Sequence, residues 1–257
     1  MLLSRNKIKY LNSLKLKKFR NIHGQFVVEG DKIVRDILLL HEIKIRMMVA
    51  GRAWLARNPV KHPDRILEIA EADESDLSRI SSFESPPEVL AVLDIPVTEL
   101  SYAEITDALC IVLDDIRDPG NLGTIIRTAD WFGIRNIICS NSCADCYNPK
   151  VVQASMGALL NVMVFYADLP DVLGELYGNK DYTIYGTFLQ GQSVFDIQPA
   201  RKGALVFGNE SRGIANSLLP FITNRITIPP GKASGKHVES LNVASAVAII
   251  CAVFDKS

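Results

Sequence analysis

The segment from Asp118 to Gly123 places polar side chains where an apolar run gives way to a helical pattern. Asn121 can cap such a helix, because its side chain can accept a hydrogen bond from an N–H group of the first turn. The N-terminal amides of a helix attract anions. Arg127 lies six residues later, nearly two turns on, and can project to the side of the same end. A capped core helix with a surface arginine would give the same pattern.

Two later segments repeat this change from apolar to polar residues. Gly208 ends a buried apolar run, and a glycine there permits close approach of a ligand to the backbone, with Glu210 following where a cleft would lie. Further on, Ser240 can cap a helix that is almost wholly apolar, and Asn242 stands at the start of that helix. Taken singly, each segment also fits an ordinary polar turn or helix cap.

From about residue 105 the apolar pattern alternates between strands and helices, which predicts an α/β domain with a mostly parallel sheet. In such open sheets, ligands bind outside the carboxyl ends of the strands, where the three polar segments fall. We expect strands at Leu109–Leu113, Asn136–Cys139, Val162–Tyr166, Tyr182–Gly186, Ala204–Phe207 and Arg225–Ile228. We expect helices at Asn121–Phe132, Lys150–Leu160, Asp171–Tyr177 and Leu241–Phe254.

A smaller α/β domain is expected in front of this sheet. Apolar residues at three-residue spacing around Leu11 predict an amphipathic first helix. Phe26–Gly30 and Val89–Leu93 predict short buried strands, with a second amphipathic helix after the first of them. A proline then begins a linker, so we place one domain over residues 1–96 and the other over residues 97–257.

Charge is distributed unevenly along the chain, although its net value is only −1. No acidic residue precedes Glu29. A local basic surface is what contacts with the phosphates of a nucleic acid require, although a solvated helix face would carry the same charges. The basic residues of this stretch are Arg5, Lys7, Lys9, Lys15, Lys17, Lys18 and Arg20.

In this order and together, the three polar segments closely resemble the three motifs of the SpoU family in the SPOUT superfamily. Asp118–Gly123 with Arg127 resembles the first motif, and Gly208–Glu210 resembles the second. Ile228-Pro229 with Ser240–Ala244 resembles the third. The resemblance spans residues 109 to 254, and residues 1–95 are similar to the L30e-like substrate-binding domain often fused in front.

The resemblance implies an RNA 2′-O-ribose methyltransferase that uses S-adenosylmethionine and needs no metal. The implied catalytic residues are Asn121, Arg127, Glu210, Ser240 and Asn242. The implied cofactor-binding residues are Leu205, Phe207, Gly208, Ile228, Pro229 and Leu241. The implied RNA-binding residues are Lys15, Lys17, Lys18 and Arg20. A guanidinium is effectively always protonated, so we expect Arg127 to clamp the target phosphate rather than act as a base.

The resemblance also implies a C-terminal trefoil knot and a homodimer. The expected helix Leu241–Phe254 is apolar nearly all round, so one of its faces needs a partner beyond its own sheet. Ribosomal RNA is favoured over transfer RNA as the substrate, because of the N-terminal domain. Two departures from the family pattern bear on substrate fit: the loop Gly231–His237 is long, and Ser211 replaces a frequent glycine.

Parts of the sequence also resemble motifs of other protein classes. Cys139, Cys143 and Cys146 have the C-x3-C-x2-C spacing of radical S-adenosylmethionine enzymes, but we expect reduced thiols without a metal. The Gly231–His237 loop is one residue too short for a phosphate-binding P-loop. The alternative from another class is a non-catalytic RNA-binding protein associated with the ribosome. The presence of all five implied catalytic residues in this sequence favours the enzyme.

The cellular setting is predicted to be the cytoplasm. The sequence has no run of about 18 apolar residues and no signal-peptide pattern at its start, so we expect no membrane span. Five cysteines, an odd number, favour reduced thiols.

Overall fold

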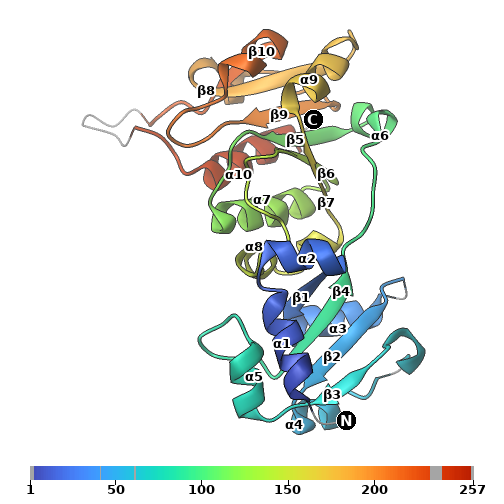
Figure 1. The fold of residues 1–257 in the computed structure, drawn as a ribbon. Coiled ribbons are helices and arrows are strands. Elements are labelled where there is room, and N and C mark those ends of the chain that lie inside the picture. The colour runs from blue at the N-terminus through green and yellow to red at the C-terminus, as the bar shows by residue number, and fades with distance from the viewer. Residues whose placement is uncertain (1–2, 41, 61, 232–238, 256–257) are drawn as a thin grey trace. The chain divides into compact units, whose positions relative to one another are not determined.

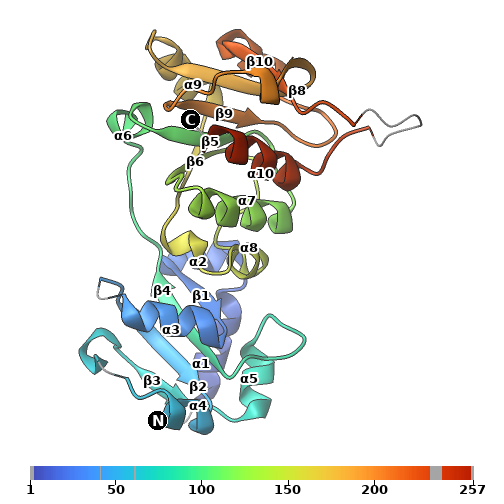
Figure 2. The same ribbon diagram turned by 180° about the vertical axis from the view of Figure 1, so that it is seen from behind.

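The computed structural model describes residues 3–40, 42–60, 62–231 and 239–255. The chain folds into two compact units (Figures 1 and 2). The first comprises Met1–Thr98 and Tyr147–Gly157, and the second comprises Glu99–Cys146 and Ala158–Ser257. The segment Tyr147–Gly157 therefore packs with the first unit, although it lies far along the sequence of the second expected domain. Most of the long loop after Gly231 lies outside the described residues.

The first unit is built on a four-stranded sheet in the order β1-β4-β2-β3. Its strands are β1 Gln25–Glu29, β2 Ile45–Ala50, β3 Ile69–Glu71 and β4 Val89–Asp94. Its helices are α1 Arg5–Ser13, α2 Lys17–His23, α3 Asp31–Leu39, α4 Arg52–Arg57, α5 Glu74–Ile80 and α8 Pro149–Ser155, with a 3-10 turn at η1 Pro63–Arg65. The two strands and two amphipathic helices expected from the sequence are confirmed.

The core of the first unit follows from the amphipathic pattern of its helices. Leu11 and Leu14 from the first helical segment pack with Leu77 of α5 against Val49 and Val92 on one face of the sheet. Helix α3 covers the opposite face (Figures 1 and 2). This unit is therefore a sheet with helices on both faces.

The second unit contains the six-stranded sheet, in the order β10-β8-β9-β5-β6-β7. Its strands are β5 Leu109–Leu113, β6 Asn136–Ser140, β7 Met163–Ala167, β8 Thr183–Ser193, β9 Gly203–Phe207 and β10 Asn224–Thr227. Its helices are α6 Tyr102–Thr106, α7 Pro119–Trp131, α9 Leu169–Tyr177 and α10 Val243–Phe254, with 3-10 turns at η2 Ala158–Leu160, η3 Val194–Asp196 and η4 Asn216–Phe221. All pairings between these strands are parallel, which confirms the expected α/β class.

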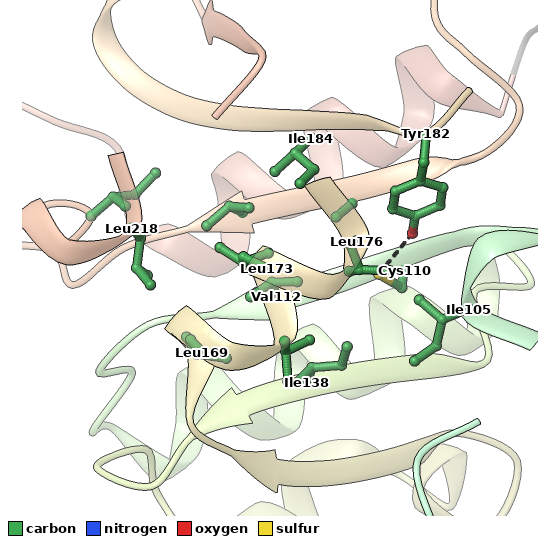
Figure 3. Close-up of a cluster of buried hydrophobic side chains, with 14 residues drawn as sticks. Ile105, Cys110, Val112, Ile138, Leu169, Leu173, Leu176, Tyr182, Ile184 and Leu218 are labelled. Carbon is green, nitrogen blue, oxygen red and sulfur yellow. Dashed lines mark hydrogen bonds between the residues drawn. The ribbon is translucent and has the colours of Figure 1, made fainter. Parts of the chain in front are cut away.

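Helices cover both faces of this parallel sheet. Cys110 and Val112 point from β5 to the face covered by α9, where they pack with Leu173 and Tyr182 (Figure 3). On the other face, the ring of Tyr185 in β8 lies 4.9 Å from that of Phe254 in α10. Helix α10 in turn packs against α7. The α7–α10 layer carries two of the three polar segments.

One expected helix, Lys150–Leu160, is interrupted. Helix α8 ends at Ser155, and Met156 then adopts a left-handed conformation with φ of 53°. A glycine with positive φ follows at Gly157 before the chain resumes as the 3-10 turn η2. The break coincides with the boundary between the two units. Among the described residues, no helix is long and apolar enough to cross a bilayer.

Candidate active site

The turn from β5 into α7 fixes the first polar segment. Asp118 caps α7, because its Oδ1 accepts a hydrogen bond from the backbone N–H of Asn121 at 2.8 Å, and Pro119 occupies the first helical position. The expectation that Asn121 is the cap is therefore wrong: it stands three residues inside the cap. Its side chain is left to make contacts outside the helix.

Those contacts join the three polar segments. The Asn121 Nδ2 donates to Glu210 Oε1 at 2.6 Å, and Asn242 Nδ2 donates to Asn121 Oδ1 at 2.9 Å. Asn242 also caps α10, because its Oδ1 accepts from the backbone N–H groups of Ala244 and Ser245. Ser240 is therefore not the cap that the sequence suggested. We call Asn121, Glu210 and Asn242 the amide–carboxylate network.

The loop after β9 closes on itself. Gly213 N–H donates to the Asn209 carbonyl at 2.8 Å, and Asn209 Oδ1 accepts from the backbone N–H groups of Ser211 and Arg212. A Cβ added to Gly208 would lie 2.2 Å from the carbonyl carbon of Gly213. A glycine is needed at position 208 because of the loop's own backbone.

Two aspartates hold this loop against the end of β5. Asp114 Oδ2 accepts from the backbone N–H of Ala215 at 2.8 Å. Asp115 adopts a left-handed conformation with φ of 59°, and its carbonyl accepts from Asn209 Nδ2 at 3.0 Å. Burial raises the pKa of Asp115, but hydrogen bonds from Arg117 and Ser142 and the nearby Arg212 outweigh this, so its pKa lies below the ordinary 3.8. The carboxylate is therefore charged where it meets the arginines.

A cavity of about 880 Å³ opens beside Glu210. Of the residues expected to bind a cofactor, the cavity is lined by Phe207, Gly208, Ile228, Pro229 and Leu241. The exception is Leu205, which is fully buried in the sheet and does not line the cavity. Glu210 and Ser240 line it as well, whereas Asn121, Arg127 and Asn242 do not.

One wall of the cavity was not predicted. Strand β8 pairs with β10 through Gly186 opposite Arg225 and then through Gln192 opposite Ile226. The five residues 187–191 therefore bulge out of the ladder, and bulges often lie beside functional sites. Four of them, residues 187–190, line the cavity together with Arg225. The glycines at 186 and 191 were the available signal, since glycines within a strand indicate a bulge.

Arg127 lies on a different side of α7 from Asn121. Six residues of α-helix separate them by about 9 Å along the axis and about 120° around it. Arg127 shares an exposed face with Thr124 and Trp131, and Trp131 is 83% exposed. Among the described residues, the Arg127 guanidinium has no hydrogen-bond or ion-pair partner. It does not join the amide–carboxylate network of its own chain.

The basic residues of the first unit differ in their environments. Lys17 and Lys18 are exposed at the start of α2. The Lys15 ammonium donates to the Ser81 carbonyl at 2.8 Å, and burial lowers its pKa. Arg20 is only 2% exposed, and its Nη1 donates to the carbonyls of Leu14 and Lys15 at 2.8 Å. Arg20 therefore stabilises the end of α1, and its burial leaves it little surface with which to contact RNA.

The three cysteines of the triplet, Cys139, Cys143 and Cys146, are all buried. Cys143 Sγ accepts from the Ile116 N–H at 3.2 Å and donates to the Leu113 carbonyl at 3.3 Å. A hydrogen bond from Cys139 lowers the pKa of Cys143 to about 7. All five cysteines are free. Over the described ranges, no three His, Cys, Asp or Glu side chains are grouped as metal ligands; that the protein binds no metal stays a prediction.

Each of the two units contains a match to a known protein family. Residues 108–252 match the SpoU rRNA Methylase family, and residues 5–91 match the MRM3-like substrate binding domain. The chain is 29% identical over 246 residues to the 23S rRNA (guanosine(2553)-2′-O)-methyltransferase RlmP of Bacillus subtilis, covering 95% of this chain and 94% of that protein.

Solved structures of other proteins share the whole fold. A putative RNA methyltransferase of the TrmH family from Porphyromonas gingivalis is 41% identical, with a TM-score of 0.85 over 99% of this chain and 98% of the other. An AdoMet-bound rRNA methyltransferase from Sinorhizobium meliloti is 26% identical, with a TM-score of 0.84 over 99% and 95% of the two chains. The family match covers more than half of the sequence and includes all three polar segments. The chain belongs to the SpoU rRNA Methylase family.

Proposed function

We propose that this SpoU-family methyltransferase transfers the methyl group of S-adenosylmethionine to a ribose 2′-hydroxyl of ribosomal RNA. The observation that carries the proposal is the amide–carboxylate network, in which Asn121 bridges Glu210 and Asn242 beside the cavity. Each of these residues comes from a different motif. Their convergence at the carboxyl ends of β5 and β9 is what an assembled active site requires.

The cavity fits the cofactor. Its volume of about 880 Å³ lies within the range of small-molecule sites, about 300–1,000 Å³. Apolar side chains such as Phe207, Ile228 and Leu241 suit the adenosyl part, and the polar loop after β9, which carries Glu210, suits the positively charged sulfur. When bound, S-adenosylmethionine supplies a methyl group on a positively charged sulfur. The residues that line the cavity would hold it.

Glu210 is the residue proposed to receive the substrate hydroxyl. Its Oε1 is occupied by the Asn121 amide at 2.6 Å, whereas its Oε2 bonds to no described residue. A fixed carboxylate with one oxygen left can accept a hydrogen bond from the ribose hydroxyl and so orient that group. Asn121 and Asn242 act by holding this carboxylate in place.

Arg127 is proposed to hold the phosphate next to the target ribose. A guanidinium binds phosphate through two parallel hydrogen bonds and stays protonated. Since Arg127 faces away from the network of its own chain, we propose that it completes the site of a second copy in a homodimer. The exposed Trp131 on the same face and the apolar α10 support this arrangement.

The first unit is proposed to bind RNA. The match of residues 5–91 to a substrate-binding domain and the exposed Lys17 and Lys18 support this role, and Lys15 lies next to them. The B. subtilis relative acts on 23S rRNA, which favours ribosomal over transfer RNA. A trefoil knot in the second unit and a cytoplasmic location remain predictions.

The test is a methyl-transfer assay with purified protein, ribosomal RNA and tritium-labelled S-adenosylmethionine. The RNA is digested to nucleosides, and the label is expected in a 2′-O-methylated nucleoside. Label in a methylated base would contradict the ribose target. RNA binding without any transfer would favour the alternative function, a non-catalytic RNA-binding protein.

A further inference from the structure

The cavity is lined by an arginine that forms no ion pair with any carboxylate of the described residues. The described residues that line it include two arginines, Arg212 and Arg225. The Arg212 guanidinium lies 3.5 Å from Asp115 Oδ2 and is paired with it. Arg225, by contrast, makes no ion pair with any described residue. Its guanidinium carbon lies 4.1 Å from the centre of the Phe188 ring, and Phe188 lines the same cavity.

The bulge in β8 builds a platform for this arginine. A Cβ added to Gly191 would lie 2.7 Å from the Arg225 carbonyl oxygen, so the bulge returns tightly over the Arg225 backbone. A Cβ added to Gly186 would lie 2.7 Å from the Phe188 ring and 2.8 Å from Ile222. The ring is thus held between these residues, and the guanidinium that stacks on it is held as well.

A stacked guanidinium is prepared to bind an oxyanion. Stacking uses the face of the group and leaves the N–H donors along its edge available. Those donors match the two oxygens of a carboxylate in a bidentate pair. Because Phe188 already restricts the Arg225 side chain, less conformational entropy is lost when the anion binds.

We propose that Arg225 binds the carboxylate of the methionine part of S-adenosylmethionine. The inference rests on the proposed function, since it names a contact within the same cavity. The adenosine of this cofactor is uncharged, and its sulfur and amino group are positive, so the carboxylate is its one anionic group. Arg225 thereby selects ligands that carry the complete amino-acid part.

The test is calorimetric and needs no turnover. The full-length protein is titrated with S-adenosylhomocysteine, which has the carboxylate, and with 5′-methylthioadenosine, which lacks it. For Arg225→Gln we expect the dissociation constant of S-adenosylhomocysteine to rise about 10- to 100-fold, as for loss of a hydrogen-bonded charge pair. The constant for 5′-methylthioadenosine should change less than about twofold, which also shows that the cavity is intact.

Two further variants make the comparison specific. Arg225→Lys keeps the charge but loses the bidentate geometry, so its affinity for S-adenosylhomocysteine should fall between the other two proteins. Arg201→Gln removes an exposed arginine that does not line the cavity and should bind both ligands like the wild type.

Three results would overturn the inference. The first is an unchanged affinity of Arg225→Gln for S-adenosylhomocysteine, and the second is an equal loss for both ligands. The third is a loss of RNA affinity alone in filter binding, which would assign Arg225 to an RNA phosphate. If the wild type bound neither ligand, the proposed function itself would fail, and this outcome is distinct from the first three.

Discussion

The Asn121 amide donates to the Glu210 carboxylate at 2.6 Å, although 89 residues separate the two in the sequence. This contact joins the start of α7 to the loop after β9. Asn242 extends it to the start of α10 through its bond to the Asn121 oxygen. Three segments that each fit an ordinary turn or cap thus form one polar site.

Loss of the Glu210 charge should lower the rate of methyl transfer much more than the stability of the fold. In Glu210→Gln the side chain can no longer offer two acceptor oxygens, one to Asn121 and one to the substrate. We expect kcat to fall about 10²- to 10³-fold, as for removal of a preorganised polar group in other enzymes. The tritium-methyl assay measures this, with Glu104→Gln on exposed α6 as the matched control. Turnover near the wild-type value would remove Glu210 from the mechanism.

Substitution of Arg127 should separate catalysis from cofactor binding. Arg127 does not line the cavity, so Arg127→Ala should bind S-adenosylmethionine with unchanged affinity in calorimetry. Methyl transfer should be abolished, because the target phosphate loses its clamp. Arg201→Ala is the control for removal of an exposed arginine. Substantial turnover by the Arg127 variant would contradict its role.

Substitution of Arg20 should lower the stability of the fold, whereas substitution of Lys18 should weaken RNA binding. Arg20→Ala leaves the carbonyls of Leu14 and Lys15 without their buried donor, so the free energy of unfolding should fall by about 2–4 kcal/mol. Urea denaturation, followed by fluorescence of the buried Trp54, measures this. Lys18→Ala should leave stability unchanged but lower RNA affinity and its salt dependence. The reverse pattern would show that the buried arginine is the RNA contact.

Much of the fold could be predicted from apolar periodicity alone. The bounds of β5 agree residue for residue, and the apolar run stops sharply because Asp114 and Asp115 follow Leu113 directly. The order of the strands could not be predicted, since β9 pairs with β5 across about 90 residues of chain. The packing of Tyr147–Gly157 with the first unit is likewise a long-range contact that local patterns do not encode.

Sequence patterns predicted which residues form the site better than they predicted the role of each residue. Asn121 and Ser240 were both expected as helix caps, because asparagine and serine favour that position. Asp118 and Asn242 take it instead, and both stand within the same motifs. Burial separates Arg20 from the exposed lysines, and Leu205 precedes Phe207, the first residue of β9 in the cavity lining, by two positions. Neither follows from residue type.

The proposed homodimer predicts a specific effect of Trp131. Light scattering of the wild type should give about twice the monomer mass. Trp131→Glu places a charge on the exposed face of α7 and should shift the mass towards the monomer and reduce methyl transfer together. Val97→Glu, at a residue that is 98% exposed, is the control. A wild type that is monomeric and active at sub-micromolar concentration would refute the shared site.

The most direct test of the central claim is to map 2′-O-methyl groups across total RNA from cells with and without this protein. We expect at least one 2′-O-methyl position in ribosomal RNA to disappear with the protein. The same position should reappear when the wild type is restored and stay absent with Glu210→Gln. An unchanged ribosomal RNA map, or a lost methyl group on a base instead of a ribose, would contradict it.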